Sequence, residues 1–268
     1  MATQAIAKPT RPVLAGNGQP SIEDSAPAHP GTFRTNSLVA GVMYLLTFVS
    51  IPTLFLYVPI HASSYILGPG PDTNVMIGAI LEMIVGLTGI GTAVALYSVI
   101  KRQGEGRALG FVASRTLEAA GIFMGVAFLL SVVSLRQAGA GTGALPTAHA
   151  LVALYDRIFL LSGSFIPAVN AVLLGSLLYQ SRLVPRALPV LGFIGVPLLI
   201  TADAAVLFGV IGRTAAPVAL AAIPIAIWEF SLGVYLVVKG FRPSAVTALY
   251  NRTGAVDNRS FVPVATAP

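Results

Sequence analysis

Five acidic residues and one arginine lie in stretches of the sequence that are otherwise apolar. The acids are Glu82, Glu118, Asp156, Asp203 and Glu229, and the base is Arg115. A charge at the centre of a membrane helix costs about 2.5–3.5 kcal/mol on insertion scales, so such residues usually pair with one another or serve a function. Carboxyl groups in this setting can carry protons or bind a polar solute, and an arginine can supply the counter-charge.

Two interpretations of these residues remain open. In the first, Glu82, Glu118 and Glu229, with Arg115 as counter-charge, form a proton relay or a polar-solute site that serves proton-coupled or small-solute transport. In the second, the same charges are structural and fix the register of the helices, as in a non-catalytic membrane sensor or assembly component. Asp203 belongs to the same intramembrane set, and we expect it and Glu82 to lie nearer the outer side than the others.

The spacing of these residues indicates which of them meet. Arg115 and Glu118 are three residues apart, so on a helix their side chains adjoin and can pair. Glu82, Glu118 and Glu229 each share a helical face with small residues: Gly78, Gly86, Gly89 and Ala93 with the first, Gly110, Ser114, Gly121 and Gly125 with the second, and Ala222, Ala226 and Gly233 with the third. Small residues let helices approach closely in lipid. We therefore expect the three helices that carry these acids to meet.

Other candidates are weaker. His61, His149 and Asp156 all fall at the expected outer face, but their spacing fits no recognised metal site, and loop positions explain them better. We expect Asn170 to form a hydrogen bond with a neighbouring helix. The chain has no cysteine, and no nucleophile–base pair, phosphate-binding loop or dinucleotide motif occurs. We expect no cofactor and no metal, and an enzyme is the least favoured class.

The elements that must position these residues are six apolar stretches, each long enough to cross a hydrocarbon core of about 30 Å as a helix. The chain is 55% hydrophobic and only 10% charged, with a mean hydropathy of +0.83, whereas soluble domains carry about 25% charged residues. Period-2 alternation is absent, which argues against a β-barrel. We predict an all-α, polytopic transmembrane bundle of six helices, at about 37–58, 75–100, 108–135, 152–179, 188–211 and 216–238.

The distribution of lysine and arginine predicts the orientation. With the N-terminus inside, the cytoplasmic segments contain twelve basic residues and the outer segments contain three, Arg136, Arg157 and Arg213. Both termini are thus expected in the cytoplasm, with the tails 1–36 and 243–268 disordered. Because the charges flank apolar runs, the lipid bilayer rather than nucleic acid is the expected partner, along with a proton or small solute. Oligomeric partners are not indicated.

Several segments resemble a known family. They are Leu81-Glu82 and the downstream GLTGIGTAVALYSVIKR, SRTLEA at 114–119, SRLVPRALPVLGFIG at 181–195, and WEFSLGVYLVVKGF at 228–241. In order and spacing they are similar to the family called domain of unknown function 4386, over residues 37–242. The resemblance implies a six-helix bundle in a bacterial inner membrane and supplies no reaction or ligand. The residues that match its pattern are Glu82, Arg115, Glu118, Arg182, Pro185, Glu229, Lys239, Gly240 and Phe241.

Overall fold

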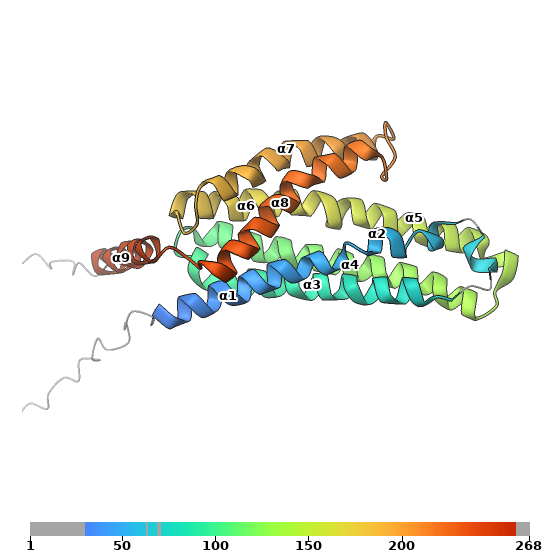
Figure 1. Ribbon diagram of the computed structural model, residues 1–268, viewed down its shortest axis with the longest axis horizontal. Coiled ribbons are helices and arrows are strands. Elements are labelled where there is room, and N and C mark those ends of the chain that lie inside the picture. Colours follow the sequence, from blue (N-terminus) through green and yellow to red (C-terminus); the bar gives the residue numbers. More distant parts are fainter. Residues whose placement is uncertain (1–29, 63, 69–70, 261–268) are drawn as a thin grey trace, which may run out of the picture.

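A computed structural model of the chain describes residues 30–62, 64–68 and 71–260, and within this part it contains helices and no strands. The helices form one elongated bundle whose long axis runs from the start of α1 to the turns beyond α2, α4 and α7 (Figure 1). Six helical segments are long and apolar enough to cross a membrane: Phe33–Leu56, Thr73–Ile100, Glu105–Gln137, Gly141–Ser181, Ala187–Leu207 and Ala216–Val238. The predicted fold class is confirmed.

The regular helices are joined by short turns and single-turn helices. The α-helices are α1 (Pro30–Leu46), α2 (Thr53–Leu56), α3 (Thr73–Ile100), α4 (Glu105–Gln137), α5 (Leu145–Ile158), α6 (Ile166–Ser181), α7 (Ala187–Leu207), α8 (Ala216–Val238) and α9 (Pro243–Ser260). The 3₁₀ turns are η1 (Thr47–Ser50), η2 (Pro59–His61), η3 (Tyr65–Leu67) and η4 (Gly141–Ala144), and η5 (Phe159–Phe165) is a π-helix.

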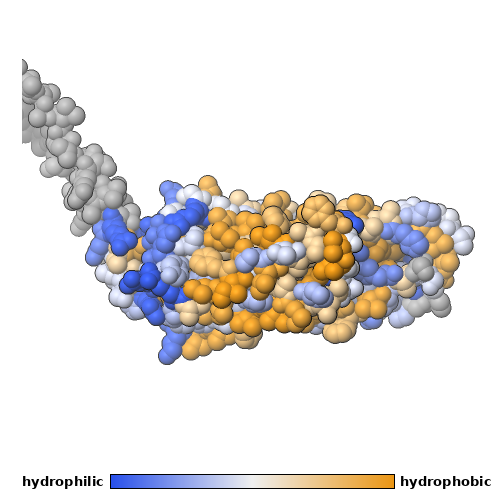
Figure 2. Space-filling model, turned by 90° about the horizontal axis from the view of Figure 1, so that it is seen from above, coloured by the Kyte–Doolittle hydropathy of each residue, from blue (hydrophilic) through white to orange (hydrophobic). Residues whose placement is uncertain are grey.

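The two ends of the bundle differ in composition. The start of α1, the α3–α4 and α6–α7 turns and α9 lie together at one end (Figure 1), which we call the basic end. Figure 2 shows hydrophilic residues gathered there, an apolar band along the middle of the bundle, and a second polar region at the opposite end. Because the number of crossings is even, the first and last described residues lie at the same end. That this end faces the cytoplasm remains the prediction of the basic-residue count.

Both predicted tail boundaries need correction. The predicted tail 1–36 is wrong for residues 30–36, which belong to α1, because Arg34 donates hydrogen bonds to the carbonyl oxygens of Leu236 and Val237 (3.3 and 2.7 Å) and so fixes this turn against the end of α8. The predicted disordered tail 243–268 is wrong for residues 243–260, which form α9. One apolar face of α9 is buried in the core: Ala245, Val246 and Leu249. Residues 1–29 and 261–268 lie outside the described part.

Two of the spans are irregular at the same depth. In the first, α1 gives way to η1 and then to α2, with Pro52 between them; proline lacks the N–H that a continuous helix needs and clashes with the preceding turn. In the fourth, η5 separates α5 from α6, and Pro167 stands in the first turn of α6. π-helical turns are rare and occur frequently at functional sites.

The buried apolar residues form two clusters along the bundle. One, toward the basic end, includes Tyr44, Leu96, Phe111 and Trp228, and the other, toward the opposite end, includes Tyr57, Val75, Leu129 and Tyr155. On α3 and α4 the residues between these clusters include Glu82, Arg115 and Glu118. The packed core therefore brackets the charged residues that the sequence singled out.

Helix α4 approaches the π-helix closely at Gly121. A Cβ atom at this position would overlap the Cβ of Ser162 in η5. Gly121→Ala is therefore expected to lower the free energy of unfolding by about 1–3 kcal/mol through overpacking. Thermal unfolding in detergent measures this effect.

Two further variants test the cause of that loss. Gly106→Ala, at an exposed position of the same helix where an added Cβ would have no atom within 4 Å, should be neutral or slightly stabilising. Ser162→Gly should make Gly121→Ala less destabilising than it is alone. A double variant that loses the full sum of both single effects would contradict the close contact.

Candidate functional site

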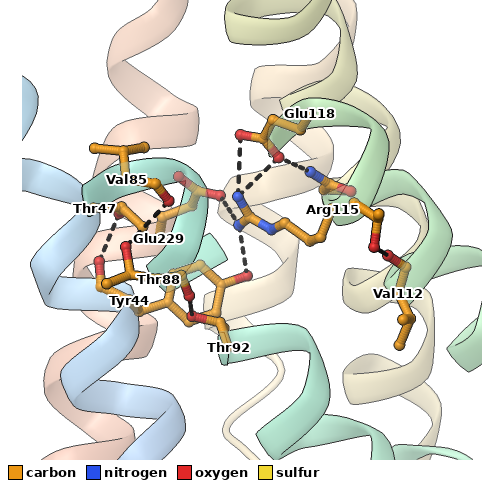
Figure 3. Close-up of polar contacts among 11 residues, drawn as sticks. Tyr44, Thr47, Val85, Thr88, Thr92, Val112, Arg115, Glu118 and Glu229 are labelled. Atoms are coloured by element: carbon orange, nitrogen blue, oxygen red, sulfur yellow. Dashed lines mark hydrogen bonds and ion pairs between the residues drawn. The ribbon is translucent and has the colours of Figure 1, made fainter. Parts of the chain in front are cut away.

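Arg115 lies at the centre of a buried polar cluster between helices (Figure 3). One terminal nitrogen donates to both oxygens of Glu118 on the same helix, at 3.2 and 3.0 Å. The other donates to Glu229 on α8 at 2.7 Å and to the hydroxyl of Tyr44 on α1 at 3.2 Å. The predicted pairing of Arg115 with Glu118 is thus present, and the same guanidinium also binds an acid from a distant part of the sequence.

Glu118 extends the cluster to a fourth helix. The side-chain amide of Asn170, on α6, donates a 2.6 Å hydrogen bond to it, which confirms the hydrogen bond expected for Asn170. The Arg115 cluster, meaning Arg115, Glu118, Glu229, Tyr44 and Asn170, therefore joins α1, α4, α6 and α8. Arg115 is 3% exposed, so its charge depends on these partners rather than on water.

The prediction that three acid-bearing helices meet is right in part. Helices α3 and α4 pack along their lengths, whereas α8 packs mainly against α1 and α7 and reaches α4 through the pair of Glu229 with Arg115. Gly233, on the small-residue face of α8, was expected to face the other acid-bearing helices. It lies instead against Tyr44 and Leu45 of α1.

A cavity of about 250 Å³ lies beside the Arg115 cluster, on the side of the irregular spans. Two carboxyl groups line it, Glu82 from α3 and Glu118 from α4. The rest of its wall includes residues from both irregular segments and from the small-residue stripe of α4: Ser50, Ile51, Thr53, Leu54, Gly121, Gly125, Phe159, Ser162 and Gly163. We call this the acidic cavity.

Glu82 lacks the cationic partner that Glu118 has. It accepts a 2.8 Å hydrogen bond from the hydroxyl of Tyr155, and no lysine, arginine or histidine in the described part of the chain forms an ion pair with it. The buried hydroxyl of Tyr57 faces the same carboxyl without forming a hydrogen bond. The ring of Tyr57 lies where a Cβ of Gly78 would be, so this glycine is needed for the ring to reach Glu82.

Asp203 lies apart from the other predicted residues. It accepts a 2.6 Å hydrogen bond from Ser164 of η5 and is not among the residues lining the acidic cavity. Of the five predicted site residues, the structure thus brings Arg115, Glu118 and Glu229 into contact, places Glu82 on a cavity shared with Glu118, and separates Asp203. The tyrosines Tyr44, Tyr57 and Tyr155 were not predicted, although the glycines at 78 and 125 that admit two of them were.

Comparison with known protein families shows which family the chain belongs to. The family model described as Domain of unknown function (DUF4386) matches residues 39–240, which include all five predicted site residues. The chain belongs to the DUF4386 family. The resemblance found in the sequence is therefore confirmed, and with the six apolar helices it makes the chain an integral, multi-pass membrane protein. Comparisons with curated proteins and with solved structures found no match.

This DUF4386 protein carries a second polar group at the end of the bundle opposite the basic end. His61 lies with Nδ1 at 2.8 Å from the carbonyl oxygen of Tyr57 and Nε2 at 3.1 Å from Asp156. Arg213 also pairs with Asp156, at 2.9 Å. Among the described residues no group of three or more histidines, cysteines or acids is arranged to hold a metal.

The contacts of His61 with Tyr57 and Asp156 favour its protonated form, whereas Arg213, 3.5 Å from Nε2, opposes it. A neutral imidazole has one N–H, so it cannot donate to both oxygens, whereas imidazolium can. The hydrogen bond to Asp156 raises the pKa of His61 above its ordinary value, although burial and the nearby Arg213 oppose this. His61 follows Tyr57 by one turn, so its protonation state bears on the segment that places Tyr57 against Glu82.

Removing the central cation tests the structural role of the cluster. Arg115→Met leaves Glu118 and Glu229 buried without their counter-charge, and we expect a loss of about 3–5 kcal/mol in the free energy of unfolding. Arg107→Met is the matched control, because Arg107 lies on the same helix and contacts only the neutral side chains of Ser176 and Gln180. Arg107→Met should lower the free energy of unfolding less than Arg115→Met does.

A charge-balanced variant separates electrostatics from packing. Adding Glu118→Gln and Glu229→Gln to Arg115→Met removes the unpaired charges and should recover part of the stability. Thermal unfolding of the purified protein reports all of these variants. Equal losses for Arg115→Met and Arg107→Met would show that the bundle does not depend on the cluster.

The raised pKa of His61 gives a pH dependence with a definite sign. Its stabilising contribution is fully present below the ordinary histidine value of 6.5 and is lost as the pH rises through the higher value of the folded state. The Tm difference between wild type and His61→Gln should therefore be larger at pH 5.5 than at pH 9. In an Asp156→Asn background the difference should change little with pH, and parallel pH profiles in both backgrounds would refute this role.

Proposed function

We propose that this protein carries protons across the membrane through Glu82 and the acidic cavity, coupled to movement of a small polar solute. The observation that supports this best is a buried carboxyl group, Glu82, on a cavity of about 250 Å³ without a cationic partner. Ionisable residues inside a membrane are expensive to retain and often mark proton relays or substrate pathways.

The backbone around the cavity supports the same proposal. Breaks in a regular membrane-spanning helix are tolerated where they are buried in protein or line a cavity. Here η1 and α2 of the first span and η5 of the fourth contribute residues to one cavity wall. Interrupted helices at a membrane-embedded site are the arrangement by which many transporters bind substrates and coupling ions.

A structural role is better supported for the Arg115 cluster. One guanidinium there is shared by two carboxyl groups, and each of them has its partner within the protein. The alternative function, a non-catalytic sensor or assembly component with structural charges, would extend this role to Glu82 as well. It predicts that replacing Glu82 changes stability but no flux.

The proposed setting is the inner membrane of a bacterium, with both termini in the cytoplasm. The family resemblance and the excess of lysine and arginine at the basic end support this arrangement. In that orientation the acidic cavity lies nearer the outer side than the Arg115 cluster does, because Glu82 is one of the residues toward the opposite end of α3.

Proton flux into liposomes tests the proposal directly. The purified full-length protein is reconstituted with a pH-sensitive dye inside, and a potassium diffusion potential drives protons inward. We expect flux above that of protein-free liposomes for wild type and a return to the protein-free level for Glu82→Gln, since glutamine keeps the size and loses the titratable proton.

Two other variants make the result specific. Asp203→Asn is the matched control, because Asp203 is a buried acid that does not line the cavity, and it should retain flux. Tyr155→Phe removes the hydrogen bond to Glu82 while keeping the carboxyl, and it should shift the pH at which flux is half-maximal. Flux that is equal in wild type and Glu82→Gln would exclude Glu82 as the carrier.

A further inference from the structure

A second pocket, of about 570 Å³, lies at the basic end and differs in charge from the acidic cavity. Four arginines line it, and none of its lining residues is acidic. Arg182 and Arg186 come from the turn between α6 and α7, Arg242 directly precedes α9, and Arg252 lies in the middle of α9. Gln103 and Gln180 complete the polar wall. We call this the arginine pocket. The α6–α7 turn and α9, which carry its arginines, lie at the basic end in Figure 1.

The docking of α9 brings these four cations together. Ala245 and Leu249 of α9 belong to the same buried cluster as Leu183 and Val184 of the α6–α7 turn. The backbone N–H of Arg242 donates a 2.9 Å hydrogen bond to the carbonyl oxygen of Leu183. Apolar burial therefore sets the position of α9, and the like charges are held near one another as a result.

Three of the four pocket arginines lack the partners that other basic residues at this end have. The fourth, Arg186, donates a hydrogen bond to the carbonyl oxygen of Tyr179 and lies over the ring of the same residue. Arg34 and Arg107 donate to protein oxygens, and Arg102 stacks on the ring of Tyr250. By contrast, the side chains of Arg182, Arg242 and Arg252 have no hydrogen bond or ion pair with any described residue. A general excess of positive charge explains how many cations this end carries, but not why three of them without such partners line one pocket.

Backbone geometry adds to the positive potential. Helix α9 begins at Pro243, and Ser244 and Ala245 of its first turn line the pocket. First-turn N–H groups have no partner within the helix and carry partial positive charge. Arg182 has φ = 58°, the left-handed conformation that usually falls to glycine at a helix end, yet the position holds a long cationic side chain.

We propose that the arginine pocket binds a phosphate-bearing anion. Arginine recognises phosphate through parallel N–H donors, and basic pockets at the ends of transmembrane helices bind anionic headgroups. A phosphate group can come from an anionic phospholipid or from a soluble phosphate compound, and both present the same oxygens to the four guanidinium groups. The site is distinct in residues from the acidic cavity, so the proposal stands without the proposed function.

The test measures binding of two probes to the purified full-length protein at about 0.15 M salt, where long-range attraction is screened. The probes are inorganic pyrophosphate and nanodiscs containing phosphatidylglycerol, compared with nanodiscs of phosphatidylcholine alone. The variant Arg182→Gln with Arg252→Gln should weaken binding at least about tenfold, because each guanidinium contributes charge-assisted hydrogen bonds. If the double variant folds poorly, Arg252→Gln alone replaces it in the test. Arg252 is exposed on α9, and this single variant should also weaken binding.

A charge-matched control decides between a site and a diffuse basic surface. Lys101→Gln with Lys239→Gln removes two cations from the same end but outside the pocket, and it should leave affinity within about twofold. Binding of pyrophosphate identifies a soluble anion as ligand, and a preference for phosphatidylglycerol without pyrophosphate binding identifies a lipid headgroup. Equal losses in the two double variants, or no binding of either probe, would overturn the proposal.

Discussion

The bundle is organised around a charge that cannot be neutralised in place. Arginine keeps its proton at any pH a protein meets, so the buried guanidinium of Arg115 must be balanced by other groups. Glu118 supplies part of that balance from the same helix, and Glu229 supplies the rest from α8. Because α1 carries Tyr44 and packs against α8, the placement of the first and last spans follows from the same cation.

Glu82 differs from Glu118 and Glu229 because it has no ion pair with Arg115. The guanidinium is shared between Glu118 and Glu229, and none of the residues that line the acidic cavity is a lysine, arginine or histidine. The two halves of the bundle differ accordingly. Toward the basic end the spans are continuous and tightly packed around Trp228, whereas toward the other end the first and fourth spans are interrupted at the cavity. Interrupted helices beside a membrane-embedded cavity are the feature on which the proposed transport function depends.

The sequence predicted those features that depend on residue type and short-range spacing. Six spans follow from apolar content, and the pairing of Arg115 with Glu118 follows from their separation by three residues. The partner role of Glu229 required knowing that α8 lies beside α1, which no local pattern encodes. The π-helix at Phe159–Phe165 is as apolar as a regular helix would be, so hydropathy could not reveal it. Helix α9 escaped prediction because its apolar face is short and the rest of it is polar.

Three groups of charges in this protein can be ordered by how completely the protein balances them. The Arg115 cluster is balanced by its own helices, the acidic cavity has one carboxyl group without a cationic partner, Glu82, and the arginine pocket has more cations than anions. An unpaired charge has a larger energetic effect in the acidic cavity than in the arginine pocket, since charges interact several-fold more strongly at low effective dielectric than near water. A proton, which removes the charge itself, suits the buried carboxyl of Glu82. A solvated anion suffices for the exposed arginines, where the surrounding water already screens much of their repulsion.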